Sequence, residues 1–288
     1  MGMVQLKNII MQQIPKVIHC VWLSGDEKPR LIQDCLDSWK RVMPDYEIRE
    51  WGMADVKDIE SKFLHGAIAS RKWAFATDFL RVWILYHYGG IYMDLDVFVY
   101  QKFDKFLSHQ AFSGIEFWPS LFYRTMQTKE IKGIGVDAAI LGAVVGHPWI
   151  KDILSFYDDK EFINDPKFYM NVIMPNVIAG VSKKYGFKYV PSFQILDEGI
   201  YLYPHDIFSA VYDKSALGLS GEDYYYSLGE INKIRHSCHL CANSWGFVPQ
   251  KESVFKRIVF LFKKVILTIL GKKVVTSIKS KFKKKELY

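Results

Sequence analysis

Hydrophobic and polar positions alternate along this chain in blocks that predict strands and helices in turn. Apolar residues recur at three- and four-residue steps from Arg71 to Tyr88, the period of a helix, and Gly89-Gly90 ends the pattern. β-branched and apolar runs before and after this helix predict strands. We expect strands near 15–23, 46–51, 91–93, 97–100, 111–117 and 137–142, and helices near 31–42, 56–64 and 71–88, with another that opens at 146–149. This order predicts an α/β fold with a mixed, largely parallel central sheet and helices on both faces.

Two acids, Asp94 and Asp96, stand two residues apart directly after the Gly89-Gly90 turn. If this run is a strand, both side chains point to one face, about 7 Å apart. Carboxylates that converge on one spot repel each other unless a cation or a row of donors lies between them. An oxygen-rich site of this kind suits Mg²⁺ or Mn²⁺ carrying a diphosphate. Taken alone, the triplet could also be two surface acids at a strand end.

Asp78 and Arg81 are three residues apart on the long predicted helix, so they share one of its faces. An exposed ion pair of this type would contribute little to stability. Both residues lie, however, on an otherwise apolar helix that leads directly into the acid pair. We therefore expect one shared site, in which a carboxylate and a guanidinium on a rigid helix offer fixed acceptors and donors to a hydroxyl-rich ligand.

One stretch of the chain carries a family resemblance. Thr77–Arg81, followed by Gly89–Asp96, resembles the DXD-containing sugar-binding region of the family-32 glycosyltransferases, which include bacterial capsular-polysaccharide transferases and fungal initiating mannosyltransferases. The glucosylating domain of large clostridial toxins is more distantly similar. The resemblance implies the GT-A nucleotide-diphospho-sugar transferase fold. It also implies that Asp96 is the main metal ligand, that Asp94 contacts metal, ribose or sugar, and that Asp78, Arg81 and Tyr92 hold the donor sugar.

Two further stretches extend the resemblance. Ile14–Leu23 looks like the family's opening strand, and the resemblance implies that Trp22 at its end stacks on the nucleotide base. Ligands bind beyond the carboxyl ends of strands in open α/β sheets, although a core tryptophan would give the same pattern. Asp137 is a candidate sugar contact at a position where the family usually has asparagine.

Near the C-terminus, His239–Trp245 is similar to the family segment that closes over the diphosphate and metal. The resemblance implies that His239 is a metal or phosphate ligand and that Ser244 and Trp245 contact phosphate. Residues 118–135 are rich in polar and glycine positions, so we expect a mobile loop there. Because this loop follows the acid-bearing strands, it could contribute to acceptor choice.

Positive charge is concentrated at the C-terminal end of the chain. Residues 251–288 hold 12 Lys/Arg and two acids, a net of +10, so the total of +7 leaves about −3 for residues 1–250. Apolar residues recur there at steps of three and four and predict a basic amphipathic helix of the kind that lies in a membrane interface. They are Phe255, Ile258, Phe262, Val265 and Ile269. A helix packed on the domain is the alternative, whereas nucleic acid is disfavoured because the apolar stripe has no use on a phosphate backbone.

These interpretations predict a catalytic domain at 1–250 and a membrane-association tail at 251–288. The expected activity is metal-dependent transfer, retaining by resemblance, of a hexose-type sugar from a nucleotide-sugar (a UDP-sugar) to a saccharide acceptor. We expect the acceptor to be lipid-linked, in capsular or surface polysaccharide synthesis. Because the sequence shows no signal peptide and no apolar span of about 18 residues, we expect a cytoplasmic protein, peripheral to the inner face of the cell membrane. A protein-modifying, toxin-like transferase and a non-catalytic membrane-interaction protein stay open as alternatives.

Overall fold

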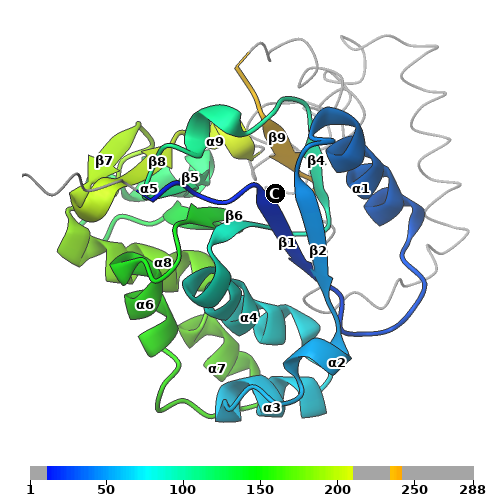
Figure 1. Cartoon of the computed structure of the whole chain (residues 1–288). Helices are drawn as coiled ribbons and strands as arrows, with labels where there is room; N and C mark the ends of the chain where they lie inside the picture. Colours follow the sequence, from blue (N-terminus) through cyan, green and yellow to red (C-terminus); the bar gives the residue numbers. More distant parts are fainter. Residues whose placement is uncertain (1–11, 210–233, 242–288) are drawn as a thin grey trace, which may run out of the picture. The chain divides into compact units, whose positions relative to one another are not determined.

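A sheet of seven strands forms the centre of the part of the chain that the structure describes (Figure 1). The computed structural model describes residues 12–209 and 234–241. The strand order in the sheet is β2-β1-β3-β6-β5-β8-β7. The strands are β1 (Val17–Val21), β2 (Glu47–Trp51), β3 (Gly90–Met93), β5 (Ala111–Phe117), β6 (Ile134–Ala143), β7 (Gln194–Leu196) and β8 (Ile200–Tyr203). A second sheet pairs β4 (Val97–Val99) with β9 (Ser237–His239), antiparallel to each other.

Strand directions confirm the expected fold class. The β2–β1, β1–β3 and β5–β8 pairs are parallel, whereas β6 runs against both of its neighbours and β7 runs against β8. Five of these seven strands (β2, β1, β3, β5 and β8) therefore point the same way. The result is a mixed, largely parallel sheet, as the alternation of strands and helices predicts.

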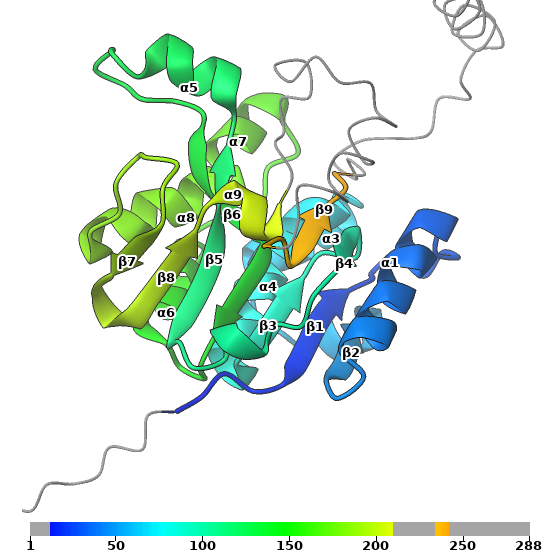
Figure 2. The same ribbon diagram turned by 90° about the horizontal axis from the view of Figure 1, so that it is seen from above.

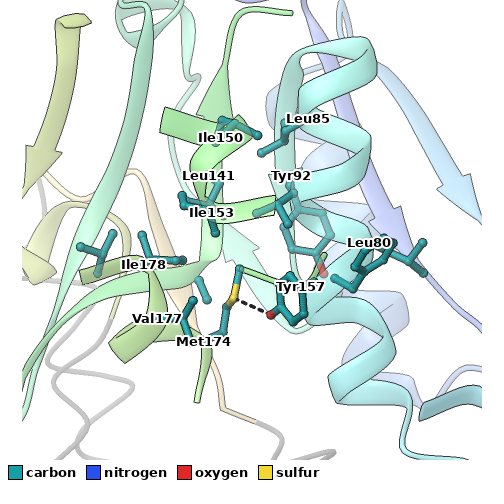
Figure 3. Packing of buried hydrophobic residues seen from close by; sticks show 14 of the residues in the cluster. Leu80, Leu85, Tyr92, Leu141, Ile150, Ile153, Tyr157, Met174, Val177 and Ile178 are labelled. Atoms are coloured by element: carbon teal, nitrogen blue, oxygen red, sulfur yellow. Dashed lines mark hydrogen bonds between the residues drawn. The ribbon is translucent and has the colours of Figure 1, made fainter. Parts of the chain in front are cut away.

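Helices cover both faces of the sheet, as expected (Figures 1 and 2). The helices of the described residues are α1 (Arg30–Val42), α2 (Met53–Val56), α3 (Lys62–Ala69), α4 (Trp73–Tyr88), α5 (Pro119–Thr125), α6 (Pro148–Ser155), α7 (Pro166–Asn171), α8 (Met174–Ser182) and α9 (His205–Phe208). One buried cluster packs α3, α4, α6 and α8 on one face, and a second packs α1, α9 and β4 on the other. Figure 3 shows the first cluster where Tyr157 donates its hydroxyl to Met174 Sδ at 3.2 Å.

Two expectations about local structure were wrong. The single helix predicted at 56–64 is two helices, α2 and α3, because the chain turns at 57–61 and Ser61 caps the second helix by accepting from the Leu64 N–H at 3.2 Å. The loop predicted at 118–135 contains α5, which begins with Pro119 in its first turn, where the missing N–H costs nothing. The sequence pattern also did not indicate the short strands β7, β8 and β9.

Gly89 and Gly90 end α4 and start β3, and both need to be glycine. Their φ angles are +63° and +91°, in the region that other residues avoid. A Cβ on Gly90 would lie 2.7 Å from the Val17 carbonyl oxygen. His19 fixes the same turn, because its Nε2 lies 3.1 Å from the Gly89 oxygen while its Nδ1 accepts from the Trp51 indole at 3.2 Å. Burial lowers the pKa of His19 to about 4, so this bridging imidazole stays neutral.

Within the described residues, no helix combines the length and the apolar character that a bilayer crossing requires.

Gly142 on β6 faces the Phe112 ring of β5, and this contact generates a stability test. A Cβ on Gly142 would lie 2.1 Å from Phe112 Cε1, and that ring is buried against Phe106 and Phe208. Gly142→Ala should therefore lower the free energy of unfolding by about 1–3 kcal/mol or more. Gly180→Ala is the matched control, because Gly180 lies in α8 with nothing near its Cβ position, and it should be neutral or stabilising by up to about 1 kcal/mol. Urea unfolding of both variants checks the pair, and equal stabilities would contradict the packing.

Candidate metal centre and active site

The Asp94-Leu95-Asp96 run lies in a tight turn between β3 and β4. The Val97 N–H donates to the Asp94 carbonyl at 3.0 Å and closes this turn. The expectation that both acids stand on one face of a strand was therefore wrong, because β3 and β4 belong to different sheets and the chain must change direction between them. The turn still brings the carboxylates together. Ligand atoms of Asp94, Asp96 and His239 all lie within 4.8 Å of one another.

His239 reaches this turn through β-pairing across a long sequence separation. Strand β9 pairs with β4 so that His239 faces Val97, and the Leu240 N–H donates to the Asp96 carbonyl at 2.9 Å. His239 Nε2 then lies 3.3 Å from Asp96 Oδ1. All three candidate ligands are partly exposed. Two carboxylates and one imidazole form a donor set that fits Mn²⁺ or Mg²⁺ with positions left for ligand oxygens.

Arg81 is a buried cation that joins α4, the acid turn and β6. Its Nη2 lies 2.8 Å from Asp78 Oδ1 and 3.5 Å from Asp94 Oδ1, and its Nη1 donates to the Ala138 carbonyl. The guanidinium also lies over the Tyr92 ring, 4.8 Å from the centroid. Burial alone would lower the pKa of Arg81, but Asp94, Tyr92 and Asp78 together raise it. The guanidinium therefore stays charged and holds three elements in one geometry.

Asp78 carries an unsatisfied oxygen at this site. One carboxylate oxygen binds Arg81, whereas Oδ2 is buried without a hydrogen-bond partner in the described structure. Burial raises the pKa of Asp78 to about 7, against the opposing pull of Arg81. A buried polar atom without a partner is costly, and it is uncommon in a folded protein. A hydroxyl of a bound ligand would satisfy this oxygen.

Tyr92 forms a hydrogen bond to one of the two acids in the turn, Asp94. Its hydroxyl donates to Asp94 Oδ1 at 2.6 Å, and burial raises the pKa of Tyr92 well above its usual value, so it remains a neutral donor. Asp94 is therefore held by both Tyr92 and Arg81. Asp96 lies beside His239, whose Nε2 is 3.3 Å from Asp96 Oδ1. The two acids of the turn therefore have different neighbours.

Asp137 lies in a bulge of β6 that faces the same site. The β5–β6 register jumps from Ser113↔Leu141 to Ile115↔Val136, which interrupts the pairing of residues 137–140 with β5, while Ile140 still pairs with Met93 of β3. Ser113 Oγ lies 2.7 Å from the Asp137 carbonyl and 2.8 Å from that of Ile140, while Arg81 and the Asp94 N–H occupy the two carbonyls between them. The buried Asp137 carboxylate accepts from the Ala139 N–H and from the Ser209 hydroxyl. Burial raises its pKa.

Of the other predicted binding residues, the structure describes Trp22 but not Ser244 or Trp245. Trp22 lies just beyond the carboxyl end of β1, where its indole donates to the Asp26 carbonyl at 2.9 Å and its ring lies 5.4 Å from the Lys28 ammonium. It is partly exposed, so it is not the fully buried core residue of the alternative interpretation. Ser244, Trp245 and the whole predicted tail lie outside the described residues.

Sequence reasoning missed Glu116, near the carboxyl end of β5. Its side chain interacts electrostatically with both Asp137 and His239, which places it beside the predicted site residues. Strand β5 runs parallel to β3, so Glu116 lies at the same end of the sheet as the Asp94–Asp96 turn. The signal that was overlooked is that Glu116 is a single acid one residue before the end of an apolar strand. Ligands bind beyond the carboxyl ends of strands in open α/β sheets.

A model of a known protein family matches the central part of this site. Residues 29–113 match the family model for the glycosyltransferase sugar-binding region containing the DXD motif. The resemblance expected from the sequence is therefore confirmed over the segment that carries Asp78, Arg81, Tyr92, Asp94 and Asp96. Trp22, Asp137 and His239 lie outside that segment.

Two curated relatives are the inositol phosphoceramide mannosyltransferases 3 and 2 of Schizosaccharomyces pombe. The chain is 26% identical to the first over 169 residues and 30% identical to the second over 149 residues. These alignments cover 56% and 49% of this chain but only 40% and 37% of the relatives. The chain thus spans less than half the length of the curated relatives it matches. A solved structure, the PaToxG glycosyltransferase, is similar over 60% of this chain and 70% of its own, at 18% identity and a TM-score of 0.42.

The contacts of Arg81 generate a test of its role. Arg81→Lys keeps the charge but loses the planar fork that reaches Asp78, Asp94 and the Ala138 carbonyl at once. We expect it to lower the free energy of unfolding by about 2–4 kcal/mol, because carboxylates are left buried with too few donors. Arg30→Lys is the matched control, since Arg30 forms an exposed pair with Asp34 and should change stability by less than about 0.5 kcal/mol. Urea unfolding separates the two, and a neutral Arg81→Lys would reduce Arg81 to a replaceable charge.

Proposed function

We propose that this chain, whose residues 29–113 belong to the DXD-containing sugar-binding region of glycosyltransferases, transfers a hexose-type sugar from a nucleotide-sugar to an acceptor hydroxyl. The observation that carries the proposal is the convergence of Asp94, Asp96 and His239 within 4.8 Å, next to the buried Asp78–Arg81 pair. Acidic and imidazole groups gather there from three parts of the sequence. Such an arrangement suits the diphosphate of a donor together with its metal.

Asp96 and His239 are proposed as the main ligands of a Mn²⁺ or Mg²⁺ ion, with Asp94 as a secondary ligand or a ribose contact. When bound, the metal would act as a Lewis acid that neutralises charge on the departing diphosphate. Asp94 is suited to a secondary role because Tyr92 and Arg81 already occupy one of its oxygens. Trp22, beyond the end of β1, is proposed to stack on the nucleotide base. Ser244 and Trp245 are proposed phosphate contacts.

Asp78, Arg81 and Tyr92 are proposed to hold the donor sugar. The position of Asp78 and Arg81 next to the acid turn supports this role, because Arg81 holds Asp78 at 2.8 Å and approaches Asp94 at 3.5 Å. Asp78 Oδ2 is buried without a partner in the described structure, so a sugar hydroxyl that binds it must displace the side chains that cover it. Asp137 is proposed to approach the sugar from β6, although both of its oxygens already accept bonds from Ala139 and Ser209. Holding the sugar in this way positions its C1 for attack.

We propose that transfer retains the anomeric configuration through same-face departure and attack. The bond from C1 to the diphosphate oxygen breaks, and its electron pair leaves with the diphosphate. The acceptor oxygen forms the new bond to C1, and its proton passes to an oxygen of the leaving diphosphate. In this scheme the protein residues orient the reactants and exclude water but form no covalent bond to the sugar.

The acceptor is proposed to be a hydroxyl-bearing group attached to a lipid. The curated relatives are named for mannosyl transfer to inositol phosphoceramide, which supports a lipid acceptor and mannose as one candidate sugar. From the resemblance, we also propose a UDP-sugar donor and a role in capsular or surface polysaccharide synthesis. Assaying UDP- and GDP-linked hexoses with lipid, oligosaccharide and protein acceptors separates these possibilities from the protein-modifying alternative.

The basic tail at 251–288 is proposed to bring the enzyme to an anionic membrane surface on the cytoplasmic side. The supporting observation is its net charge of +10 beside a stripe of apolar residues. Each basic residue near an anionic leaflet contributes about 1 kcal/mol to binding. A lipid acceptor and a membrane-bound enzyme would then meet on the same surface.

The metal assignment is tested with Asp96→Asn. This variant should bind Mn²⁺ more weakly and lower metal-dependent release of free nucleotide by at least roughly 100-fold, because a charged metal ligand is lost. Its melting temperature should stay near that of the parent, since Asp96 is partly exposed. Asp34→Asn, an exposed acid on α1, is the control and should change neither property. Titration with Mn²⁺ provides a readout separate from activity. Unchanged Mn²⁺ affinity in Asp96→Asn would refute the assignment.

The tail is tested with anionic and neutral vesicles. The full chain should bind vesicles rich in phosphatidylserine, and binding should weaken steeply with salt because exposed charges are screened beyond about 8 Å at physiological ionic strength. A chain that ends at Gln250 should lose this binding and keep a cooperative thermal transition. Neutral vesicles of phosphatidylcholine serve as the control. If the shortened chain fails to unfold cooperatively, the tail completes the fold and the anchor proposal is wrong.

A further inference from the structure

Glu116 and Asp137 each occupy a space that a glycine of the neighbouring strand leaves open. Glu116 on β5 pairs with Gly135 on β6, and a Cβ on Gly135 would lie 3.2 Å from Glu116 Oε2. Asp137 has the mirrored relation to Gly114 on β5, where a Cβ would lie 3.4 Å from the Asp137 Cβ. Each acid therefore lies over a glycine of the neighbouring strand. Gly114 lies beside Phe208, on the face that carries β4, β9 and α9, and Glu116 two residues further along β5 points to the same face. Pro175 at the start of α8 also borders the Glu116 side, 3.1 Å from a Cβ on Gly135.

Trp118 fixes the Glu116 carboxylate in place. Its indole Nε1–H donates to Glu116 Oε1 at 2.7 Å, so the two side chains hold each other in one orientation. Trp118 remains 41% exposed, which is unusual for a large indole ring next to an inward-facing acid. Helix α5 starts at the next residue, and Figure 2 shows it projecting from the end of the sheet. A partly exposed indole thus stands beside a carboxylate that it holds.

The partly buried Glu116 carboxylate would be stabilised by additional hydrogen-bond donors. Burial raises its pKa to about 7 and Asp137 adds to this effect, while Trp118 and, more weakly, His239 oppose it. Among the described residues, no lysine or arginine forms an ion pair with Glu116. A carboxylate in such surroundings is stabilised by neutral donors such as hydroxyl groups. Carboxylates that accept from hydroxyls, next to an aromatic face, suit a polyhydroxylated ring.

We infer that Glu116 and Trp118 form the subsite for the acceptor, in which Glu116 accepts hydrogen bonds from hydroxyls of a sugar or cyclitol ring and Trp118 packs against that ring. The inference rests on the proposed glycosyltransferase function. The donor-sugar residues Asp78 and Arg81 come from α4, and the metal ligands come from the β3–β4 turn and β9. Glu116 is separated from β3 by the whole width of β6. Glu116 and Asp137 nevertheless lie on adjacent strands, at the end of the sheet that carries the acid turn, so Glu116 is placed beside the proposed donor site.

Glu116→Gln is the main test, because glutamine keeps an oxygen for the Trp118 indole but removes the charge. The full-length protein is assayed with its active donor, and both hydrolysis of the donor and transfer to the acceptor are measured. We expect KM for the acceptor to rise by roughly 10- to 100-fold, the effect of losing hydrogen bonds to a charged group. KM for the donor and the rate of donor hydrolysis should change by a much smaller factor than KM for the acceptor. Trp118→Phe should keep the ring contact and lose less than Trp118→Ala.

Glu130→Gln is the matched control, because Glu130 is an exposed acid of the same connection between β5 and β6 and pairs only with Lys132. It should leave every constant unchanged. Melting curves verify that each variant folds. If acceptor KM is unchanged in Glu116→Gln, or if donor hydrolysis falls in parallel with transfer, the acceptor subsite is refuted.

A binding measurement separates failure of this inference from failure of the proposed function. Saturation-transfer NMR with methyl α-mannoside and myo-inositol needs no turnover. Signals that are present for the parent and lost in Glu116→Gln and Trp118→Ala support the subsite even if no nucleotide-sugar is consumed. Equal signals in parent and variants overturn the subsite even if the protein is an active transferase. Absence of signal from the parent with both probes also overturns it.

Discussion

The buried Arg81 guanidinium is the constraint on which the rest of the site depends. A cation inside a protein is tolerated only where anions and carbonyl oxygens surround it. Here Asp78 comes from the same helix, Asp94 from the turn after β3, and the Ala138 carbonyl from β6. Each of these groups is fixed because the cation needs it. The divergence of the two sheets makes the turn, and charge compensation by Arg81 then holds Asp94 within it.

The same requirement explains why β6 departs from regular pairing. The bulge frees the Ala138 carbonyl, which accepts from Arg81. The Ala139 carbonyl accepts from the Asp94 N–H directly after β3, and the single hydroxyl hydrogen of Ser113 is shared between the Asp137 and Ile140 carbonyls. Buried backbone groups are rarely left unpaired, so a bulge of this size persists only with such substitutes. The bulge in turn directs Asp137 toward the face that carries β9.

Local sequence could predict the elements and the central residues, because each depended on neighbours in the chain. The α4 period, the two glycines and the spacing of Asp78, Arg81, Tyr92, Asp94 and Asp96 are all local signals, and the structure brings these residues together. The turn at Asp94–Val97 was missed because it arises from the divergence of two sheets. Glu116 was missed because its position depends on Gly135 of β6, a strand that comes later in the sequence. The pairing of β9 with β4, which delivers His239, depends on contacts across more than a hundred residues and leaves no local pattern.

The path of the chain supplies most of the site from two stretches of sequence, to which β9 adds His239. Residues 78–96 supply the α4 and turn contacts as one uninterrupted piece, whereas Glu116, Trp118 and Asp137 all belong to the hairpin that runs from β5 through α5 to β6. Helix α5 and its flanking segments make up the connection of this hairpin, outside the paired strands. Changes in its length or composition would therefore leave the Arg81 network untouched. Under the proposed function, replacing this connection but not the paired strands would alter the acceptor subsite and leave the donor contacts of residues 78–96 in place.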